Sequence, residues 1–124
     1  MELMKLKISS ELTQKLRTLK GRTGLTPNIL CRMGICLSLS EPGIPDTRKQ
    51  PEDGMEFNRY TLTGQYDILF LSLLKERCLE DGIRIDENNI FLYFVAHLNR
   101  GISLIYNRVR SLGEIEKLLE RSSP

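Results

Sequence analysis

The order of apolar and polar side chains at the start of the chain has the period of a strand. Met4, Leu6 and Ile8 alternate with Lys5 and Lys7. Side chains two residues apart in a strand share a face, so we expect the three apolar residues to point inward and both lysines outward. The sequence therefore predicts a short strand with a cationic face.

The pattern then changes to helical spacing, which predicts two helices before residue 40. Ser9 or Ser10 can cap the first helix, and Gly21 stands where a residue in the left-handed conformation would end it. Thr26 and Pro27 begin the second helix, because threonine caps well and proline at the first position lacks only an N–H that would be unpaired. The core side of the first helix is formed by Leu12, Leu16 and Leu19.

The second helix is apolar around most of its circumference, and such a helix needs cover on nearly every side. Cys31, Gly34 and Ser38 form a stripe of small residues on one face, where another backbone can approach closely. The preferred interpretation is self-association through this stripe. The alternative is a central helix that the C-terminal half of the same chain covers.

Beyond residue 40 the sequence alternates between a loop, a possible strand and helical patterns. Prolines, glycines and charged residues in 41–56 indicate an exposed, flexible connection. Residues 57–62 have strand propensity and are expected to pair with residues 3–8. Thr63 is then predicted to cap a helix that ends near residue 82.

The last part of the chain completes a mainly helical fold. A longer helix is predicted to start at Asp86 or Asn88 and to carry apolar residues as far as Ile105. The expected fold is a single domain, 1–124, mainly α with a small two-stranded antiparallel β element. Its parts are a ribbon-helix-helix-like, oligomeric N-terminal part (1–40), the connection (41–56), and a strand plus helical part (57–124). A short final helix is predicted from Ile115, Leu118 and Leu119.

Composition places the chain among soluble globular proteins, because apolar residues make up 40% and charged residues 27%. The N-terminus lacks the apolar run of a signal peptide, and the apolar stretches are too short for a membrane span. Cys31, Cys36 and Cys78 are odd in number and have no C-x-x-C spacing, which argues against a disulfide framework or a zinc knuckle. A cytoplasmic protein is expected.

The net charge of +2 conceals an uneven distribution. Residues 1–50 hold nine basic and four acidic residues, whereas residues 51–124 hold nine basic and twelve acidic ones. The basic half is therefore the candidate surface for a polyanion such as DNA. The cations assigned to DNA binding are Lys5, Lys7, Lys15, Arg17, Lys20 and Arg22.

The strand–helix–turn–helix order also fits a ribbon-helix-helix transcriptional regulator, in which paired strands and helix N-termini meet DNA. In that alternative Lys5 and Lys7 read base edges and the target is a palindromic operator. A protein that binds the phosphate backbone would instead depend weakly on DNA sequence and strongly on salt.

The sequence contains no evident catalytic constellation. His97 lies in an apolar segment and is interpreted as a packed histidine rather than a catalytic base. The acids on either side of Gly82 are interpreted as capping and solvated groups, with the metal centre of a nicking endonuclease as the less favoured alternative. No catalytic residue, metal or cofactor is expected. These acids are Glu80, Asp81, Asp86 and Glu87.

The segment LKGRTGLTPN, residues 19–28, joins the two predicted N-terminal helices. The start of the second helix offers free N–H groups and the positive end of the helix dipole, with Lys20 and Arg22 beside it, which favours contact with a phosphate. Gly21 and Gly24 are better explained by the turn or by close subunit contact. The sequence does not separate subunit contact from a phosphate-binding nest.

The same segment carries a family resemblance. LKGRTGLTPN, the Cys31–Arg32 helix that follows and DGMEFNRYTL at 53–62 resemble the DndE family of bacterial DNA sulfur modification proteins, across essentially the whole chain. The family motif maps onto Lys20, Gly21, Arg22, Thr23, Gly24, Thr26, Pro27 and Asn28.

The resemblance implies an accessory role in DNA phosphorothioation, the replacement of a non-bridging backbone oxygen by sulfur. It implies a homotetramer that binds double-stranded DNA, preferentially nicked, beside a sulfurtransferase-like and an ATPase-like protein of the same system. It also implies that the chain does not perform the sulfur chemistry itself. It does not say which motif residues touch DNA and which hold subunits together.

Overall fold

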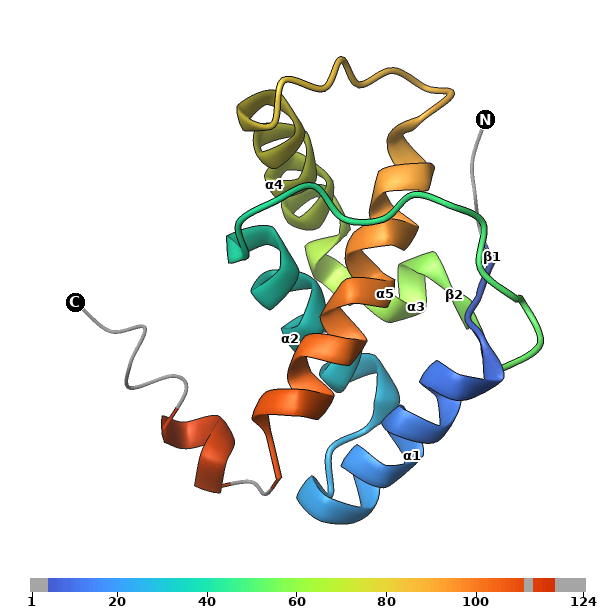
Figure 1. Ribbon diagram of the computed structural model, residues 1–124, viewed down its shortest axis with the longest axis vertical. Helices are drawn as coiled ribbons and strands as arrows, with labels where there is room; N and C mark the ends of the chain where they lie inside the picture. Colours follow the sequence, from blue (N-terminus) through green and yellow to red (C-terminus); the bar gives the residue numbers. More distant parts are fainter. Residues whose placement is uncertain (1–4, 111–112, 118–124) are drawn as a thin grey trace.

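The structure is a computed structural model that describes residues 5–110 and 113–117 (Figure 1). Residues 113–117 are helical, in the region of the predicted final helix, whereas Leu118 and Leu119 lie outside the described residues. The elements are, in chain order, β1 (Lys5–Lys7), α1 (Ser10–Thr23), α2 (Pro27–Ser40), β2 (Glu56–Asn58), α3 (Arg59–Thr63), the 3-10 turn η1 (Gly64–Tyr66), α4 (Asp67–Glu80) and α5 (Ile90–Arg108).

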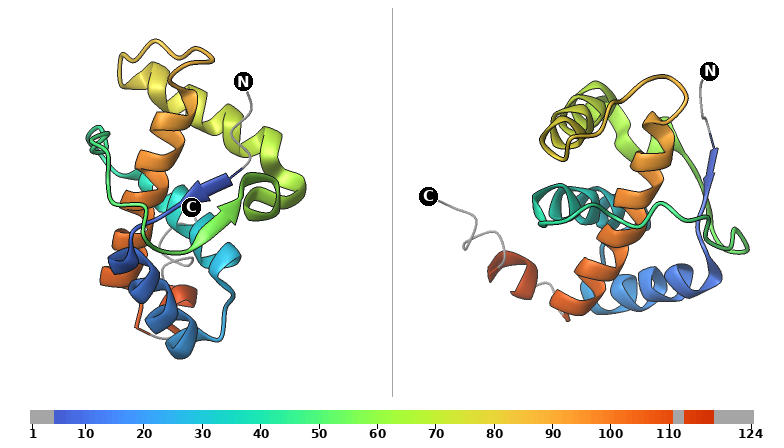
Figure 2. Two further views of the ribbon diagram at one scale, coloured as in Figure 1. Left: turned by 90° about the vertical axis from the view of Figure 1, so that its right-hand side faces the viewer. Right: turned by 45° about the horizontal axis from the view of Figure 1, so that its top comes forward.

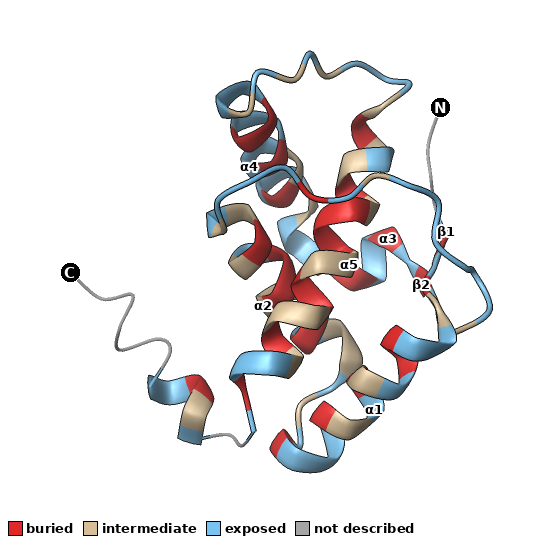
Figure 3. Ribbon diagram, viewed as in Figure 1, coloured by how far each residue is buried: buried red, intermediate tan, exposed pale blue. Residues whose placement is uncertain are grey.

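The two helices α2 and α5 form the centre of the fold and pack along each other. Figure 1 shows α5 running through the middle of the molecule, with α2 beside it, α1 below and α4 above. Figure 3 shows the buried residues gathered where these helices meet. Complete burial of one large apolar side chain in this core stabilises the fold by about 1.5–3 kcal/mol. The fully buried apolar side chains include Leu16, Leu19, Leu30, Leu62, Phe94, Leu98, Ile102 and Ile105.

The predicted two-stranded antiparallel sheet is present, and Figure 2 shows both strands next to the start of α1. Leu6 lies opposite Phe57, and both side chains are buried. The predicted strand 57–62 is wrong beyond Asn58, because the Asn58 side chain accepts hydrogen bonds from the N–H groups of Tyr60 and Thr61 and so caps α3. The strand–helix–helix order of 1–40 is confirmed, and β1 takes β2 of its own chain as its partner.

Helix α1 ends one turn later than predicted. Gly21 lies inside the helix, and Gly24 is the left-handed residue, with φ of 75° and an N–H that donates to Lys20 O at 2.8 Å. Either glycine is suited to end a helix, but only Gly24 lies just before the Thr26–Pro27 start of α2. The short spacing between the helices therefore places the stop at the second glycine.

The later helices begin after the residues that the sequence suggests. The Thr63 hydroxyl lies 2.9 Å from Arg59 O and 2.8 Å from Asp67 Oδ1 and shares its one proton between them, so it stabilises the end of α3 rather than capping α4, which starts at Asp67. Asp86 accepts hydrogen bonds from the N–H groups of Asn88 and Asn89 in a turn that precedes α5. The predicted helices are confirmed in kind, with shifted N-termini.

The connection between α2 and β2 is exposed, as predicted, and is anchored at both ends. Arg77 and Arg100 donate to Gly43 O at 2.7 and 2.8 Å. At the other end Asp53 accepts hydrogen bonds from the Ser10 N–H and hydroxyl. Figure 1 shows the connection crossing in front of α5 between these anchors.

Candidate nucleic-acid interface

The strand lysines have the predicted orientation. Lys5 and Lys7 are exposed on β1, while Leu6 and Ile8 are buried. Lys7 lies opposite Glu56 in the sheet register, so an acidic neighbour shares its face. Met4, the remaining residue of the predicted strand, lies outside the described residues. The strand thus offers two exposed cations, and Glu56 partly offsets the positive charge of Lys7.

The four cations of α1 lie around its solvent side and do not form a single row. Lys15 Nζ lies 5.5 Å and Arg22 Cζ lies 5.7 Å from the centre of the Tyr106 ring on α5. Both distances are within the range of cation–π attraction. At about 100° per residue, Arg17 and Lys20 project from the opposite flank of the helix. We call the surface formed by Lys15, Arg17, Lys20 and Arg22 the α1 cation face.

Gly21 lies within the α1 cation face, on its exposed side. A Cβ atom at this position would meet no atom within 4 Å, and φ is not in the left-handed region. Glycine inside a helix costs about 1 kcal/mol relative to alanine, and packing within this chain gives no reason for it. An open backbone on a cationic face is suited to close approach by an external group.

The turn between α1 and α2 is held by the two motif threonines. Thr23 hydroxyl donates to Leu19 O at 2.7 Å and accepts from Leu25 N–H at 3.2 Å. Thr26 side chain accepts from Ile29 N–H, and Pro27 occupies the first turn of α2, as predicted. These contacts fix the N-terminus of α2 close to the end of α1, where Lys20 and Arg22 form its last turn.

The small-residue stripe of α2 is covered by α5 of the same chain, which corrects the preferred sequence interpretation. Cys31, Gly34 and Ser38 are buried, and a Cβ atom on Gly34 would lie 2.7 Å from the carbonyl carbon of Gly101. Gly34 and Gly101 therefore allow two helix backbones of one chain to touch. A second copy has no access to this stripe.

Apolar side chains are instead exposed on α4 and on the outer side of α2. Ile68 and Leu79 of α4 are 81% and 72% exposed, and Ile29 of α2 is 40% exposed. Leu69 and Leu73 of α4 are also exposed. Several exposed apolar side chains on one helix, as on α4, indicate a surface for association.

Asp81 and Asp86, two of the acids considered for a metal centre, have structural roles. Asp81 is paired with Arg77 at 2.9 Å, and Asp86 caps a turn. Within residues 5–110 and 113–117, no three His, Cys, Asp or Glu side chains come together as metal ligands would. Burial raises the pKa of the Cys31 thiol to about 12 and also raises the pKa of Cys36, so both are protonated at neutral pH.

His97 is a packed residue, as the sequence indicates. It is 1% exposed, and its Nδ1 lies 2.8 Å from Ser38 Oγ. Arg100 Nε also donates to Ser38 Oγ, so the Ser38 hydroxyl joins the His97 ring to the Arg100 guanidinium. Burial lowers the pKa of His97 to about 4, and the positive charges of Arg100 and Arg77 add to this effect. The negative charge of Asp81 acts in the opposite direction and raises the pKa.

Acidification is therefore expected to destabilise the protein through His97. In the unfolded chain the imidazole takes up a proton near pH 6.5, whereas the folded protein resists it down to about pH 4. Stability should fall by about 2 kcal/mol between pH 7.5 and pH 5 from this group alone. Urea unfolding at both pH values measures this loss of stability. Most of the loss should be absent in the His97→Gln variant. Equal losses in the wild type and the variant would contradict the assignment to His97.

Two arginines that sequence reasoning missed organise the end of α2. Arg77 donates to Leu39 O at 2.7 Å, and Arg100 donates to Ser38 O at 2.7 Å, so both cap the carbonyl end of the helix. Arg59 is buried against Asp67, 3.2 Å from Nε to Oδ1, within range of an aromatic ring on each of α3 and α5. A sequence signal was available for Arg100, which interrupts the apolar helical run of residues 90–105.

The family comparison agrees with the resemblance carried by the motif. The family described as "DNA sulphur modification protein DndE" matches residues 5–112. No protein with a curated description matches the sequence. No helix in the described residues is both long and apolar enough to cross a membrane.

Two solved structures share the fold. DndE from Escherichia coli B7A, involved in DNA phosphorothioation modification, is 23% identical with a TM-score of 0.67, covering 85% of this chain and 98% of its own. A DndE mutant with two glycines replaced by lysine, involved in DNA phosphorothioation, is 19% identical with a TM-score of 0.65, covering 85% and 99%. Because the family match spans most of the sequence, the chain belongs to the DndE family of DNA sulphur modification proteins.

Proposed function

We propose that the chain is a non-catalytic component of DNA phosphorothioation that binds the backbone of double-stranded DNA. The observation that carries this proposal is the α1 cation face, whose last turn holds Lys20 and Arg22 next to the N-terminus of α2. Cations and free helix N–H groups bind phosphates without reading bases. Lys5 and Lys7 on β1 extend the basic surface.

The assembly that we propose is a homotetramer that prefers nicked duplex. The exposed apolar side chains of α4 support association of copies, which would place several α1 cation faces on one DNA molecule. Its proposed partners are the sulfurtransferase-like and ATPase-like proteins of the same system, in the cytoplasm. Light scattering tests the assembly, and the mass of a single chain would contradict it.

Charge reversal in the last turn of α1 tests DNA binding directly. Lys20→Glu with Arg22→Glu should weaken binding to a nicked duplex by about tenfold or more at low salt, because two phosphate contacts become repulsive. Fluorescence anisotropy with labelled duplex measures the affinity.

The matched control is Arg84→Glu with Arg110→Glu, which reverses two exposed cations on the loop after α4 and just beyond the end of α5. This variant should keep wild-type affinity. Both variants should remain folded, and the Lys20 and Arg22 variant should melt at a slightly lower temperature, because Arg22 lies against the Tyr106 ring and both residues are in the last turn of α1. Equal weakening in the two variants would show that net charge, rather than the α1 cation face, governs binding.

A further inference from the structure

A groove lies between the second half of α2 and the second half of α4, two helices that Figure 1 shows next to each other. It contains a hollow of about 260 Å³, with Cys36 and Leu39 of α2 in one wall and Leu73, Glu76 and Glu80 of α4 in the other. We call it the acidic groove. Small-molecule sites usually enclose about 300–1,000 Å³, so the hollow is better suited to side chains of another protein.

The apolar surface of the acidic groove continues along both helices. Leu69 precedes Leu73 by about one turn of α4, and Ile29 precedes Cys36 by about two turns of α2, so each pair lies on one side of its helix. All four side chains are exposed. Exposed apolar side chains on two neighbouring helices form a surface that an amphipathic helix can cover.

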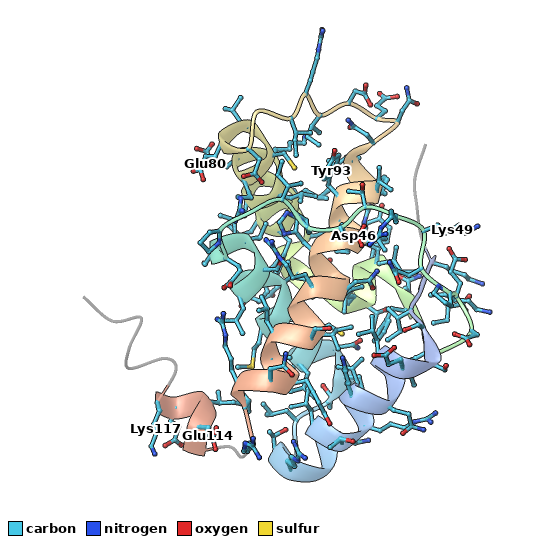
Figure 4. The ribbon with its side chains drawn as sticks, in the orientation of Figure 1. Asp46, Lys49, Glu80, Tyr93, Glu114 and Lys117 are labelled. Carbon is cyan, nitrogen blue, oxygen red and sulfur yellow. The ribbon has the colours of Figure 1, made fainter. Side chains whose placement is uncertain are left out.

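The free charges in the walls of the acidic groove are negative. Glu76 and Glu80 are exposed, lie one turn apart and form no ion pair with any described residue. Figure 4 shows Glu80 directed outward from α4. Arg77 also lines the hollow, but it is buried and donates to Asp81 and to carbonyl groups at the end of α2 and beyond. The groove therefore attracts a partner with cations beside its apolar side chains.

A second copy of this chain fits the acidic groove poorly. Its α1 cation face has cations, but no large apolar side chain is exposed on α1. Its α4 exposes Ile68 and Leu79 on another flank of the helix, with the single cation Lys75 beside them. That flank lies about 100° around α4 from Leu69 and remains for contact between copies.

We propose that the acidic groove binds a basic amphipathic helix of a partner protein, whose apolar side fills the hollow and whose cations pair with Glu76 and Glu80. In contacts of this kind the helix presents apolar residues at positions i, i+3, i+4 and i+7. Cations one turn apart beside that stripe match the spacing of the two acids. Figure 1 shows α4 and α1 at opposite ends of the molecule, so this inference goes beyond the proposed function and does not depend on DNA binding.

Reversing the two groove acids tests the choice of partner. The probes are two synthetic peptides of about four helical turns with the same leucine stripe, one with lysines beside the stripe and one with glutamates. The wild type should bind the lysine peptide about tenfold more tightly than the glutamate peptide. Glu76→Lys with Glu80→Lys should reverse this preference, and isothermal titration calorimetry measures the four affinities.

The matched control is Glu52→Lys with Glu87→Lys, which changes the net charge equally at two exposed acids outside the acidic groove. This variant should keep the wild-type preference for the lysine peptide. An equal change of preference in the two variants would show that net charge governs peptide binding and would overturn the proposal.

The Cys36 thiol provides a second measurement, on the unmodified protein. Cys36 is exposed in the groove wall, whereas Cys31 and Cys78 are buried, so a maleimide reagent modifies Cys36 first. The lysine peptide at saturation should slow this modification at least tenfold, and the glutamate peptide should not. Unchanged rates with both peptides overturn the proposal. A lower solution mass of Leu73→Glu in light scattering also overturns it, because the groove is then a contact between copies.

Discussion

Replacement of Gly34 by alanine is expected to lower the free energy of unfolding by about 3 kcal/mol, the upper end of the range for overpacking a core. The added Cβ atom would lie 2.7 Å from the Gly101 carbonyl carbon and 2.8 Å from its oxygen. Both neighbours are backbone atoms, so no side chain can rotate away and the helices α2 and α5 must move apart. Thermal unfolding should show a melting temperature lower by roughly 10 °C.

Gly21→Ala is the matched control, because it makes the same substitution in an exposed helix interior where nothing lies within 4 Å. It should raise the stability by up to about 1 kcal/mol through helix propensity. Gly101→Ala should behave like Gly34→Ala, since each glycine faces the backbone of the other. A Gly34→Ala protein of normal stability but reduced solution mass would return the stripe to a subunit contact.

These glycines show how far the sequence leads. A stripe of small residues at helical spacing indicates correctly that a backbone comes close, but the identity of that backbone depends on tertiary packing. Gly101 is a single glycine in α5, without a stripe of its own to mark it as the partner. The spacing of small residues is a property of one helix, whereas the helix that packs against it is determined by the packing of the whole core.

The local errors have a similar origin in competing short-range interactions. Propensity favours a strand through residues 57–62, yet the Asn58 side chain captures the N–H groups of Tyr60 and Thr61 and starts a helix. Gly21 and Gly24 both suit a helix end, and the Gly24–Lys20 hydrogen bond selects the second. In contrast, the Thr26–Pro27 start of α2 is predicted to the residue, because cap and proline agree.

The sequence identifies the basic residues of the candidate site but not their arrangement on a surface. Alternation placed Lys5 and Lys7 outward correctly, since β1 needs only its own pattern. The sequence could not show that Lys15 and Arg22 share the Tyr106 ring of α5, which lies far along the chain. Nor could it show that Arg100 of α5 caps the carbonyl end of α2.

Duplex affinity is expected to fall about a thousandfold between 50 and 200 mM monovalent salt, if the six assigned cations Lys5, Lys7, Lys15, Arg17, Lys20 and Arg22 all meet phosphates. Each neutralised phosphate releases condensed counterions, and this release is less favourable at higher salt. Competition with random duplex should reduce binding as effectively as competition with identical duplex, because phosphates carry no base identity. Anisotropy titrations at four salt concentrations give the slope of log affinity against log salt.

The slope also tests how many cations engage. Lys20→Glu with Arg22→Glu should flatten it by about two phosphate equivalents, whereas the Arg84→Glu and Arg110→Glu control should leave it unchanged. A shallow slope combined with strong preference for one palindromic sequence would instead favour a ribbon-helix-helix regulator that reads bases with Lys5 and Lys7. Since β1 is paired with β2 of its own chain and Lys7 faces Glu56, we expect the steep, sequence-independent result.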